Sequence, residues 1–339
     1  MTNQSKKYPL LILLILVVLC SCQQKNTNSK QFDVPINESV KNFNITAEKS
    51  QPVEKPAVIY RSTDMGKTWT SFAKGIPENA TLSGIIQEGN KLYVTTDYHG
   101  IFKSIDGENN WNPLSSDKLK GLDINCIEVE GNQLVIGTLN RGILVSNDGG
   151  ITWNPSKTNI ANSVRAFIKI EGKLYAGTDS GIFESTDMGN TWSHLFGKIQ
   201  ILGFTFLNNK IYAATQNGVL VSNENASVWR SIYDGDALHD IGNDGQYIYA
   251  MTIGQQLLKT QNDGELWKNA QNGITYPVNF YTNELKHTGS NIFSAQWIGI
   301  YHSSNNGNSW NKLNGLPDST AFSTLEITDY GIVAGISIR

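Results

Sequence analysis

The sequence predicts an all-β protein: a single seven-bladed β-propeller whose blades are four-stranded antiparallel sheets. A short polar motif recurs between residues 62 and 310, and seven tryptophans follow one another at intervals of 37 to 43 residues. The segments between the tryptophans alternate apolar and polar residues, with Gly and Asn at the turns. A period of about 40 residues is typical of one four-stranded propeller blade. Seven repeats therefore predict seven blades.

The recurring motif reads Ser-x-Asp-x-Gly-x-x-Trp and is complete in three repeats. Asp and Ser oxygens can accept backbone N–H bonds within a turn, Gly supplies a positive φ, and Trp can cover a neighbouring blade. The complete and degenerate copies contain Asp64 and Trp69, Asp106 and Trp111, Asp148 and Trp153, Asp187 and Trp192, Trp229, Asn262 and Trp267, and Asn305 and Trp310. We predict structural roles for these residues, because each copy lies on a separate blade and the carboxylates cannot converge on a metal.

Within each repeat the strands follow one order, which the third complete copy illustrates. A strand over 167–170 reaches a turn at Glu171 and Gly172, a second strand covers 174–178, and a third covers 181–185 before the motif. Alternating apolar residues bounded by such turns are typical of antiparallel strands. We expect no helix in the repeated region.

The two ends of the repeated region complement each other. Only one strand, 57–61, precedes the first motif, whereas two strands, 323–327 and 331–334, follow the last one. These segments match the third, first and second strands of one blade. Pairing them closes the ring and removes two exposed sheet edges.

The N-terminal residues are typical of an exported protein. Lys6 and Lys7 precede eleven apolar residues, Leu10 to Cys20, which resembles a secretory signal and is shorter than the roughly 20 residues of a membrane-spanning helix. Residues 19–22, Leu-Cys-Ser-Cys, resemble the bacterial lipobox, which implies cleavage before Cys22 and lipidation of Cys22. We therefore expect a signal peptide at 1–21, a lipidated polar tether at 22–55 and the propeller at 56–339.

Charge and cysteine content exclude several functions. Removing the signal peptide changes the net charge from −3 to about −5, so there is no basic field for nucleic acid. Only Cys126 would keep a free thiol, so no disulfide framework is expected, and no His/Cys cluster suggests a metal. We expect neither a cofactor nor a metal, and a monomer.

A propeller usually binds ligands at the funnel formed by the loops between second and third strands and by the connections between blades. Side chains in these segments that could stack on sugars or hold a protein partner are Tyr98, His99, Arg141, Arg165, Tyr233, Tyr281 and Trp297. The alternative is that the aromatic residues only cover strand ends.

The motif resembles the Asp-box, or bacterial neuraminidase repeat, of sialidases and related propellers, in which it forms the turn between the third and fourth strands. Sialidase activity implies three arginines converging on a substrate carboxylate, with a tyrosine nucleophile. The five arginines are Arg61, Arg141, Arg165, Arg230 and Arg339, of which only Arg141 and Arg165 lie in expected funnel segments. The Arg-Ile-Pro signature of sialidases is absent from the sequence. We therefore do not expect sialidase activity.

Two further resemblances lead to different functions. Xyloglucanase-like glycoside hydrolases also carry Asp-boxes, but they resemble two propellers facing across a cleft, with a carboxyl pair about 5–9.5 Å apart. The photosystem II assembly-factor family consists of single seven-bladed Asp-box propellers that act as binding scaffolds. This chain resembles that family in repeat number and lipobox, and it lacks an arginine-rich patch.

We predict a membrane-tethered, non-enzymatic binding or assembly scaffold that recognises a protein or glycan at the funnel. The alternative is a carbohydrate-active hydrolase or lyase with a site around Asp97, His99, Arg141 and Tyr281. Gln23, rather than Asp, follows Cys22, and under the enterobacterial sorting rule this implies the outer membrane of the bacterial cell envelope.

Overall fold

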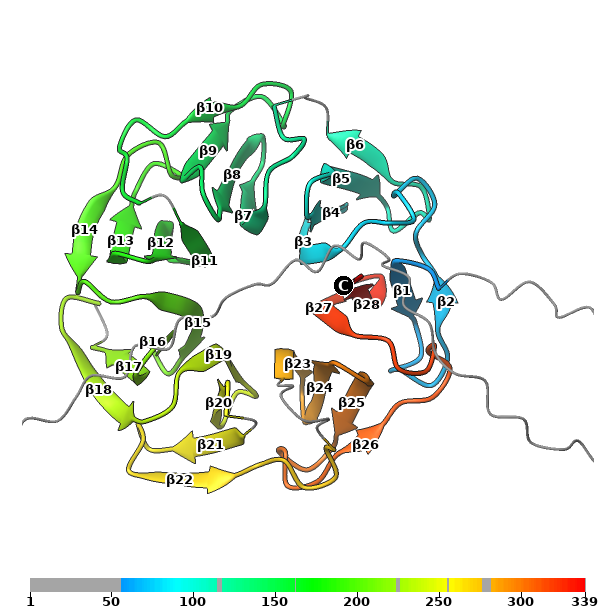
Figure 1. The fold of residues 1–339 in the computed structure, drawn as a ribbon, viewed down its shortest axis with the longest axis vertical. Coiled ribbons are helices and arrows are strands. Elements are labelled where there is room, and N and C mark those ends of the chain that lie inside the picture. The colour runs from blue at the N-terminus through cyan, green and yellow to red at the C-terminus, as the bar shows by residue number, and fades with distance from the viewer. Residues whose placement is uncertain are drawn as a thin grey trace, which may run out of the picture. The chain divides into compact units, whose positions relative to one another are not determined.

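The described part of the chain folds into a ring of seven sheets around a central axis (Figure 1). A computed structural model describes residues 56–114, 118–161, 163–223, 226–254, 256–275 and 282–338. These residues contain 28 strands, all in four-stranded antiparallel sheets, and no helix. The predicted seven-bladed propeller is thus confirmed. The predicted signal peptide and tether lie outside the described residues.

Each blade has four strands, and we number the blades from 1 to 7 along the chain, with the blade shared by the two ends as blade 7. Blade 1 has β3 (Leu82–Glu88), β4 (Lys91–Thr96), β5 (Gly100–Ile105) and β6 (Asn112–Leu114). Blade 2 has β7 (Ile124–Glu130), β8 (Gln133–Thr138), β9 (Ile143–Ser146) and β10 (Asn154–Pro155). Blade 3 has β11 (Val164–Ile170), β12 (Lys173–Thr178), β13 (Gly181–Ser185) and β14 (Ser193–Phe196). Blade 4 has β15 (Ile201–Leu207), β16 (Lys210–Thr215), β17 (Gly218–Ser222) and β18 (Trp229–Asp234).

Blades 5 to 7 complete the ring. Blade 5 has β19 (Leu238–Asn243), β20 (Ile248–Thr252), β21 (Leu257–Gln261) and β22 (Leu266–Asn269). Blade 6 has β23 (Thr282–Thr288), β24 (Asn291–Gln296), β25 (Gly299–Ser303) and β26 (Asn311–Lys312). Blade 7 has β27 (Phe322–Thr328) and β28 (Gly331–Ile336) from the C-terminal end, with β1 (Ile59–Ser62) and β2 (Thr70–Ser71) from the N-terminal end.

The first strand of each blade lies at the centre of the ring and the fourth at its outer edge (Figure 1). The second strands are the most buried: in β4 and β8, for example, every residue after the first is buried. Both faces of a blade are covered by neighbouring blades, so successive side chains on either face are apolar or small. This explains why second strands read as nearly continuous apolar runs rather than as strict alternation.

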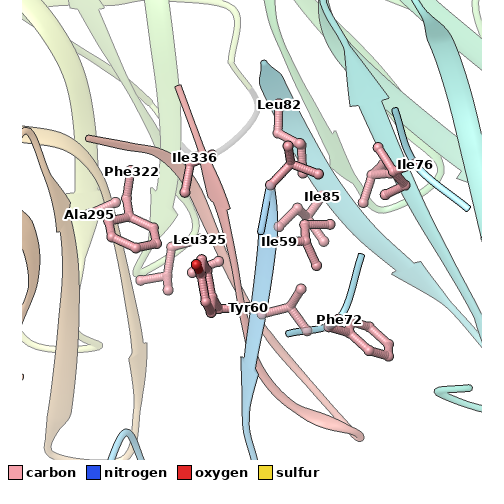
Figure 2. Close-up of a cluster of buried hydrophobic side chains, with 14 of the residues drawn as sticks. Ile59, Tyr60, Phe72, Ile76, Leu82, Ile85, Ala295, Phe322, Leu325 and Ile336 are labelled. Carbon is pink, nitrogen blue, oxygen red and sulfur yellow. The ribbon is translucent and has the colours of Figure 1, made fainter. Parts of the chain in front are cut away.

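Ring closure joins segments from opposite ends of the sequence. β1 pairs antiparallel with β28 over four residue pairs, from Ile59 opposite Gly335 to Ser62 opposite Ile332. The adjoining core contains Tyr60 beside Phe322, with ring centroids 6.2 Å apart (Figure 2). The expected division of one blade between the two ends of the repeated region is confirmed, and the pairing leaves neither β1 nor β28 as an exposed sheet edge.

The recurring motif forms the turn between third and fourth strands. In blade 2, Ser146 Oγ donates to Asp148 Oδ1 at 2.8 Å and accepts from the Gly150 N–H at 2.9 Å. The Asp148 carboxylate accepts from the N–H and the hydroxyl of Thr152, and Trp153 Nε1 donates to the Gly150 carbonyl. Gly150 has a φ of 91°, which a residue with a Cβ rarely adopts. The copies beginning at Ser62 and Ser185 make the same bonds.

The degenerate copy of blade 6 keeps the serine bonds, with Asn305 in place of the aspartate, whereas those of blades 1 and 5 form other bonds. Asp106 Oδ1 accepts from Asn90 Nδ2 rather than from a backbone N–H within its own turn. In blade 5 the motif position is Asn262, but the neighbouring Asp263 makes the hydrogen bonds, which it accepts from Lys210 and Tyr212 of blade 4. The indole N–H groups of three motif tryptophans donate to carbonyls of the preceding blade: Trp111 to Phe72, Trp267 to Ile232 and Trp310 to Ala270.

Replacing Trp153 with Ala tests the packing of the motif. Trp153 is 1% exposed, so the substitution leaves a cavity and is expected to lower the free energy of unfolding by about 3–5 kcal/mol. Ile151, in the same turn, is 66% exposed, and Ile151→Ala should change stability by no more than about 0.5 kcal/mol. Urea unfolding measures both variants. Equal losses for the two would contradict the assigned packing.

The carboxyl groups of Asp64 and Asp148 provide a pH test of the same turns. Hydrogen bonds from the threonine hydroxyl, the threonine N–H and the serine hydroxyl lower both pKa values to about 2. Because the unfolded value is about 3.9, their stabilisation is present above pH 4 and is lost as the pH falls toward 2. Carboxyl NMR titration should give these pKa values, and Ser146→Ala should raise that of Asp148. Ordinary pKa values near 3.9 in the parent protein would disprove the hydrogen-bonding scheme.

Candidate functional site

The candidate site is the central channel, a cavity of about 630 Å³ lined by the first strands of all seven blades. Because every blade is antiparallel, all first strands enter the channel from one side of the ring, called the upper face. The loops between second and third strands lie on this face. The motif turns lie on the opposite, lower face.

A β-bulge interrupts every first strand next to the upper face. A bulge leaves one residue without a partner in the ladder and re-aims its side chain. Three such side chains bond to the next blade: Asn125 Nδ2 to the Val164 carbonyl, Asn283 Nδ2 to that of Phe322, and Ser323 Oγ to that of Leu82. The seven bulge residues, all lining the channel and here called the bulge ring, are Ser83, Asn125, Arg165, Leu202, His239, Asn283 and Ser323.

Backbone hydrogen bonds hold the upper loops against the strands that enter the channel. The residue after the second strand donates its N–H to a carbonyl two residues before the bulge, as Leu139 does to Asp123 at 3.0 Å and Ile253 to Ala237 at 2.9 Å. In blade 2 the loop is also closed by Thr138, whose hydroxyl donates to the Gly142 carbonyl. The upper loops therefore form a fixed platform around the channel mouth.

Five consecutive blades present a large apolar side chain on this platform. Tyr98 is 60% exposed, Ile253 49%, Ile338 45% and Leu139 37%, while Trp297 is half-buried. We call this set the apolar arc; it follows the second strands of blades 5, 6, 7, 1 and 2 in the order Ile253, Trp297, Ile338, Tyr98, Leu139. Gathered apolar side chains on a soluble surface are typical of interaction sites.

Blades 3 and 4 carry polar side chains at the same place. Arg165 Nε lies 3.1 Å from Asp179 Oδ1, and Gln200 Nε2 donates to the same oxygen at 2.7 Å. Gln216 Nε2 donates in turn to Gln200 Oε1. The upper face thus has an apolar side and a hydrogen-bonded polar side.

The candidate funnel residues fall into separate groups. Arg165 lies in the channel wall, and Tyr98 and Trp297 belong to the apolar arc. His99 and Arg141 lie in upper loops, where the Arg141 N–H donates to the Thr138 hydroxyl.

Two candidates do not join the site. Tyr233 is on the outer strand β18, where its ring packs 5.4 Å from the Trp267 indole of the next blade. We expected Tyr233 at the funnel because the sequence placed it in a connection between blades. The structure corrects this, because packing against Trp267 holds Tyr233 at the outer edge of the ring. Tyr281 lies outside the described residues.

Charged residues in the wall below the bulge ring were missed by sequence reasoning. Lys286 Nζ lies 3.2 Å from Glu284 Oε1 and 2.8 Å from Glu326 Oε2. The second oxygen of Glu284 accepts from the Leu325 N–H at 2.7 Å. The sequence could have indicated them, because charged residues in the first strands of blades 6 and 7 depart from the apolar pattern of the repeats.

Asp240 stands apart from this network. Its Oδ1 accepts from the Ile241 N–H at 2.8 Å, and among the described residues it has no ion pair. It packs against β15 of blade 4, where a Cβ on Gly203 would lie 2.0 Å from Asp240 Oδ1. Burial, and secondarily the negative charge of Glu284, raise the pKa of Asp240 to about 7.

Two other residues of the channel wall, Lys286 and Cys126, have shifted pKa values. Burial alone would lower the pKa of Lys286, but Glu284 and Glu326 raise it above its ordinary value, so Lys286 stays charged. Burial raises the pKa of the Cys126 thiol, which makes it a poor nucleophile. No group of His, Cys, Asp and Glu able to hold a metal occurs in the residues with assigned positions. Within the same residues, no helix is long and apolar enough to span a membrane.

Comparisons with known proteins show the fold. No protein-family model and no curated protein matches the chain. YCF48 from Cyanidioschyzon merolae superposes with a TM-score of 0.60 and 14% identity, over 77% of this chain and 97% of that one. YCF48 bound to D1 peptide gives 0.58 and 17%, over 77% and 93%. The GH74 xyloglucanase from Xanthomonas campestris gives 0.61 and 13%, over 83% of this chain and 55% of the enzyme. At 13–17% identity these similarities show the β-propeller fold alone.

The raised pKa of Asp240 generates a stability prediction. The folded protein holds this proton up to about pH 7 and the unfolded chain only to about pH 4, so the stability that it contributes falls as the pH rises from about 4 and is fully lost above about 7. Asp240→Asn should remove this loss, worth at most about 4 kcal/mol at 1.36 kcal/mol per pKa unit. Urea unfolding between pH 5 and 8 compares the two proteins.

The surroundings of Asp240 make that comparison specific. β23 contributes Glu284, Lys286 and His287, and His239 adjoins Asp240 on β19, whereas β15 contributes no titratable residue. The titratable residues of β16 and β20 are Lys210 and Tyr212, which bond to Asp263, and Tyr249, which bonds to Asp244. All of these remain in the variant. Parallel pH profiles for variant and parent would show that Asp240 is not the titrating group.

Proposed function

We propose that this protein is a non-enzymatic binding scaffold whose upper face holds a partner protein. The apolar arc carries the proposal, because it places large apolar side chains on four upper loops and on the segment after β28, most of them held by hydrogen bonds to the segments that lead into the channel strands. Three members of the arc, Ile253, Ile338 and Leu139, are aliphatic. Sugar hydroxyls would lose hydrogen bonds against them, so the surface favours a protein over a glycan.

The comparisons support a binding role at the level of the fold. A propeller similar in fold, YCF48, is seen with a bound D1 peptide, and this chain spans over 90% of that protein. The similarity to the xyloglucanase covers little more than half of the enzyme. A scaffold made of a single propeller agrees with the similarity to YCF48. It does not require the part of the xyloglucanase that this chain does not cover.

The positions of the arginines support a role other than sialidase. Among the arginines with described positions, Arg165 alone lines the channel, where it pairs with Asp179. Arg61 donates to the Gly107 carbonyl in a motif turn. Arg230 is on the outer strand β18, and its Nη2 lies 3.5 Å from Asp263 Oδ2. Of the four arginines in the described residues, only Arg141 and Arg165 are on the upper side, so three of these four guanidinium groups do not converge on one carboxylate.

Two of the three channel carboxylates, Glu284 and Glu326, are engaged by a lysine. A glycoside hydrolase needs one carboxyl group that donates a proton and another that acts as base or nucleophile. Glu284 and Glu326 both pair with Lys286, at 3.2 and 2.8 Å, so neither carboxylate is free of a cation. The alternative site around Asp97, His99, Arg141 and Tyr281 includes one residue outside the described part of the chain, and it is tested below by turnover.

Photo-crosslinking tests the proposed face. p-Benzoylphenylalanine in place of Tyr98 or Ile253, in cells producing the full-length protein, should yield a discrete protein adduct. The same group in place of Ile151 or Val228, which are equally exposed on the lower face, should not. Mass spectrometry of the adducts identifies the partner. Equal labelling from both faces, or none from the upper face, would contradict the proposed docking surface.

A turnover assay addresses the enzymatic alternative. The purified protein, incubated with a panel of sialosides and polysaccharides, is expected to release no reducing sugar above the buffer control. Product formation that Asp97→Asn abolishes would replace the scaffold proposal with the hydrolase alternative.

Membrane tethering through Cys22 is part of the proposal and has its own test. Two acyl chains on the cysteine would give stable anchoring, so Cys22→Ala should move the protein from the membrane to the soluble fraction. Cys126→Ala is the matched control and should leave the distribution unchanged. Fractionation with an immunoblot measures both, and membrane retention of Cys22→Ala would rule out lipidation at this residue as the anchor.

A further inference from the structure

We propose that the partner places a lysine or arginine side chain in the channel mouth, on the Asp240 carboxylate, while neighbouring apolar residues of the same segment rest on the apolar arc. This inference rests on the proposed scaffold function and adds the chemistry of the bound segment. Two independent features lead to it: an acceptor without a cation inside the channel, and an apolar rim around the entrance.

Asp240 is the acceptor because the other charges of the wall are already paired. Lys286 is held between two carboxylates, at 3.2 Å from Glu284 and 2.8 Å from Glu326, and Arg165 pairs with Asp179. Asp240 lines the channel, and among the described residues its carboxylate accepts one bond, from the backbone N–H of Ile241, which leaves most of its acceptor capacity unused. A carboxylate in such a place is best satisfied by a charge-assisted bond from an ammonium or guanidinium group.

The channel has room for that group at the level of Asp240. The residue directly after the bulge is Asp240 in blade 5, and in four other blades the matching residue is small: Gly84, Cys126, Ala166 and Gly203. At this level the side chains that line the channel on blades 1 to 4 are therefore small. The cavity of about 630 Å³ holds a long cationic side chain without moving the wall.

Depth and position connect Asp240 to the apolar arc. Asp240 comes one residue after the bulge ring, and a strand rises about 3.3 Å per residue, so the four-carbon stem of a lysine entering at the mouth can reach it. The Ile253 N–H bonds to the Ala237 carbonyl, three residues before Asp240, so the blade-5 member of the arc stands at the entrance of the same strand. A segment lying on the arc would thus carry its cation directly above the acceptor.

Net charge favours a cation over an anion. The channel lining contains Asp240, Glu284 and Glu326 against Lys286 and Arg165, and Arg165 is neutralised by Asp179 outside the lining. An acidic side chain would meet unpaired negative charge at Asp240. A neutral apolar side chain would leave the carboxylate desolvated without a partner.

Synthetic peptides on the intact protein test the inference. The probes are fluorescein-labelled glycyl-leucyl-lysyl-leucyl-glycine amide and its analogues with arginine, norleucine or glutamate at the centre, measured by fluorescence anisotropy with the detergent-solubilised full-length protein at pH 8. Lysine and arginine peptides should bind about tenfold tighter than the norleucine peptide, as one charge-assisted hydrogen bond supplies. The glutamate peptide should bind weakest.

Three variants locate the selectivity. Asp240→Asn should reduce the preference for lysine over norleucine to less than about twofold, while the norleucine peptide keeps its affinity. Gly203→Ala should reduce the preference too, because its Cβ would displace the Asp240 carboxylate. Asp234→Asn, the same chemical change at an exposed position on the outer strand β18, should keep the tenfold preference. Thermal unfolding confirms that each variant is folded.

The outcomes separate this inference from the proposed function. Equal binding of lysine and norleucine peptides to the parent protein, unchanged selectivity in Asp240→Asn, or no peptide binding would each overturn the inference. If cross-linking from the apolar arc still identifies a partner, the scaffold function stands without the cation site. If lysine selectivity persists but cross-linking from the arc fails, the proposed docking of a protein partner is wrong.

Discussion

The whole structure depends on covering both faces of every blade. A four-stranded sheet with apolar residues on both faces is insoluble alone, and in this chain each blade covers the face of the next. The last uncovered faces disappear only when the ring closes, and the pairing of β1 with β28 closes it. The cluster around Tyr60, Phe322, Leu325 and Ile336 is therefore the place where the two ends of the ring meet (Figure 2).

The recurring motif forms the turn between the third and fourth strands of the blades. The chain reverses between third and fourth strands, and in the complete copies the serine and aspartate bond to the N–H groups of their own turn. Because these acceptors are satisfied inside the turn, the most repetitive residues are structural. The less repetitive upper face carries the variation from blade to blade that a binding surface needs: an apolar arc on five blades and a polar, hydrogen-bonded patch on two.

The channel shows how the central strands combine packing with charge. Most positions of the first strands serve contact between blades, yet Lys286, Glu284 and Glu326 form a compact network in the wall. Lys286 forms its ion pairs with Glu284 and Glu326, and among the described residues Asp240 has no ion pair. The bulge ring adds polar side chains that join adjacent blades at the mouth, which keeps the entrance open and rigid at once.

The sequence by itself determined the number of blades, the order of strands within them and the closure of the ring. Those features follow from local periodicity and from the turn chemistry of residues such as Asp148 and Gly150, which act within a few residues of themselves. Part of the site was also predictable, because loop position alone brought Tyr98 and Trp297 to the upper face. Only the tertiary structure decided that Tyr233 packs on Trp267, that Asp263 rather than Asn262 bonds to the preceding blade, and that Asp240 lacks the cation which Glu284 has. The first two contacts join residues 34 and 53 positions apart on neighbouring blades, and no local pattern records which side chain of one blade faces which side chain of the next.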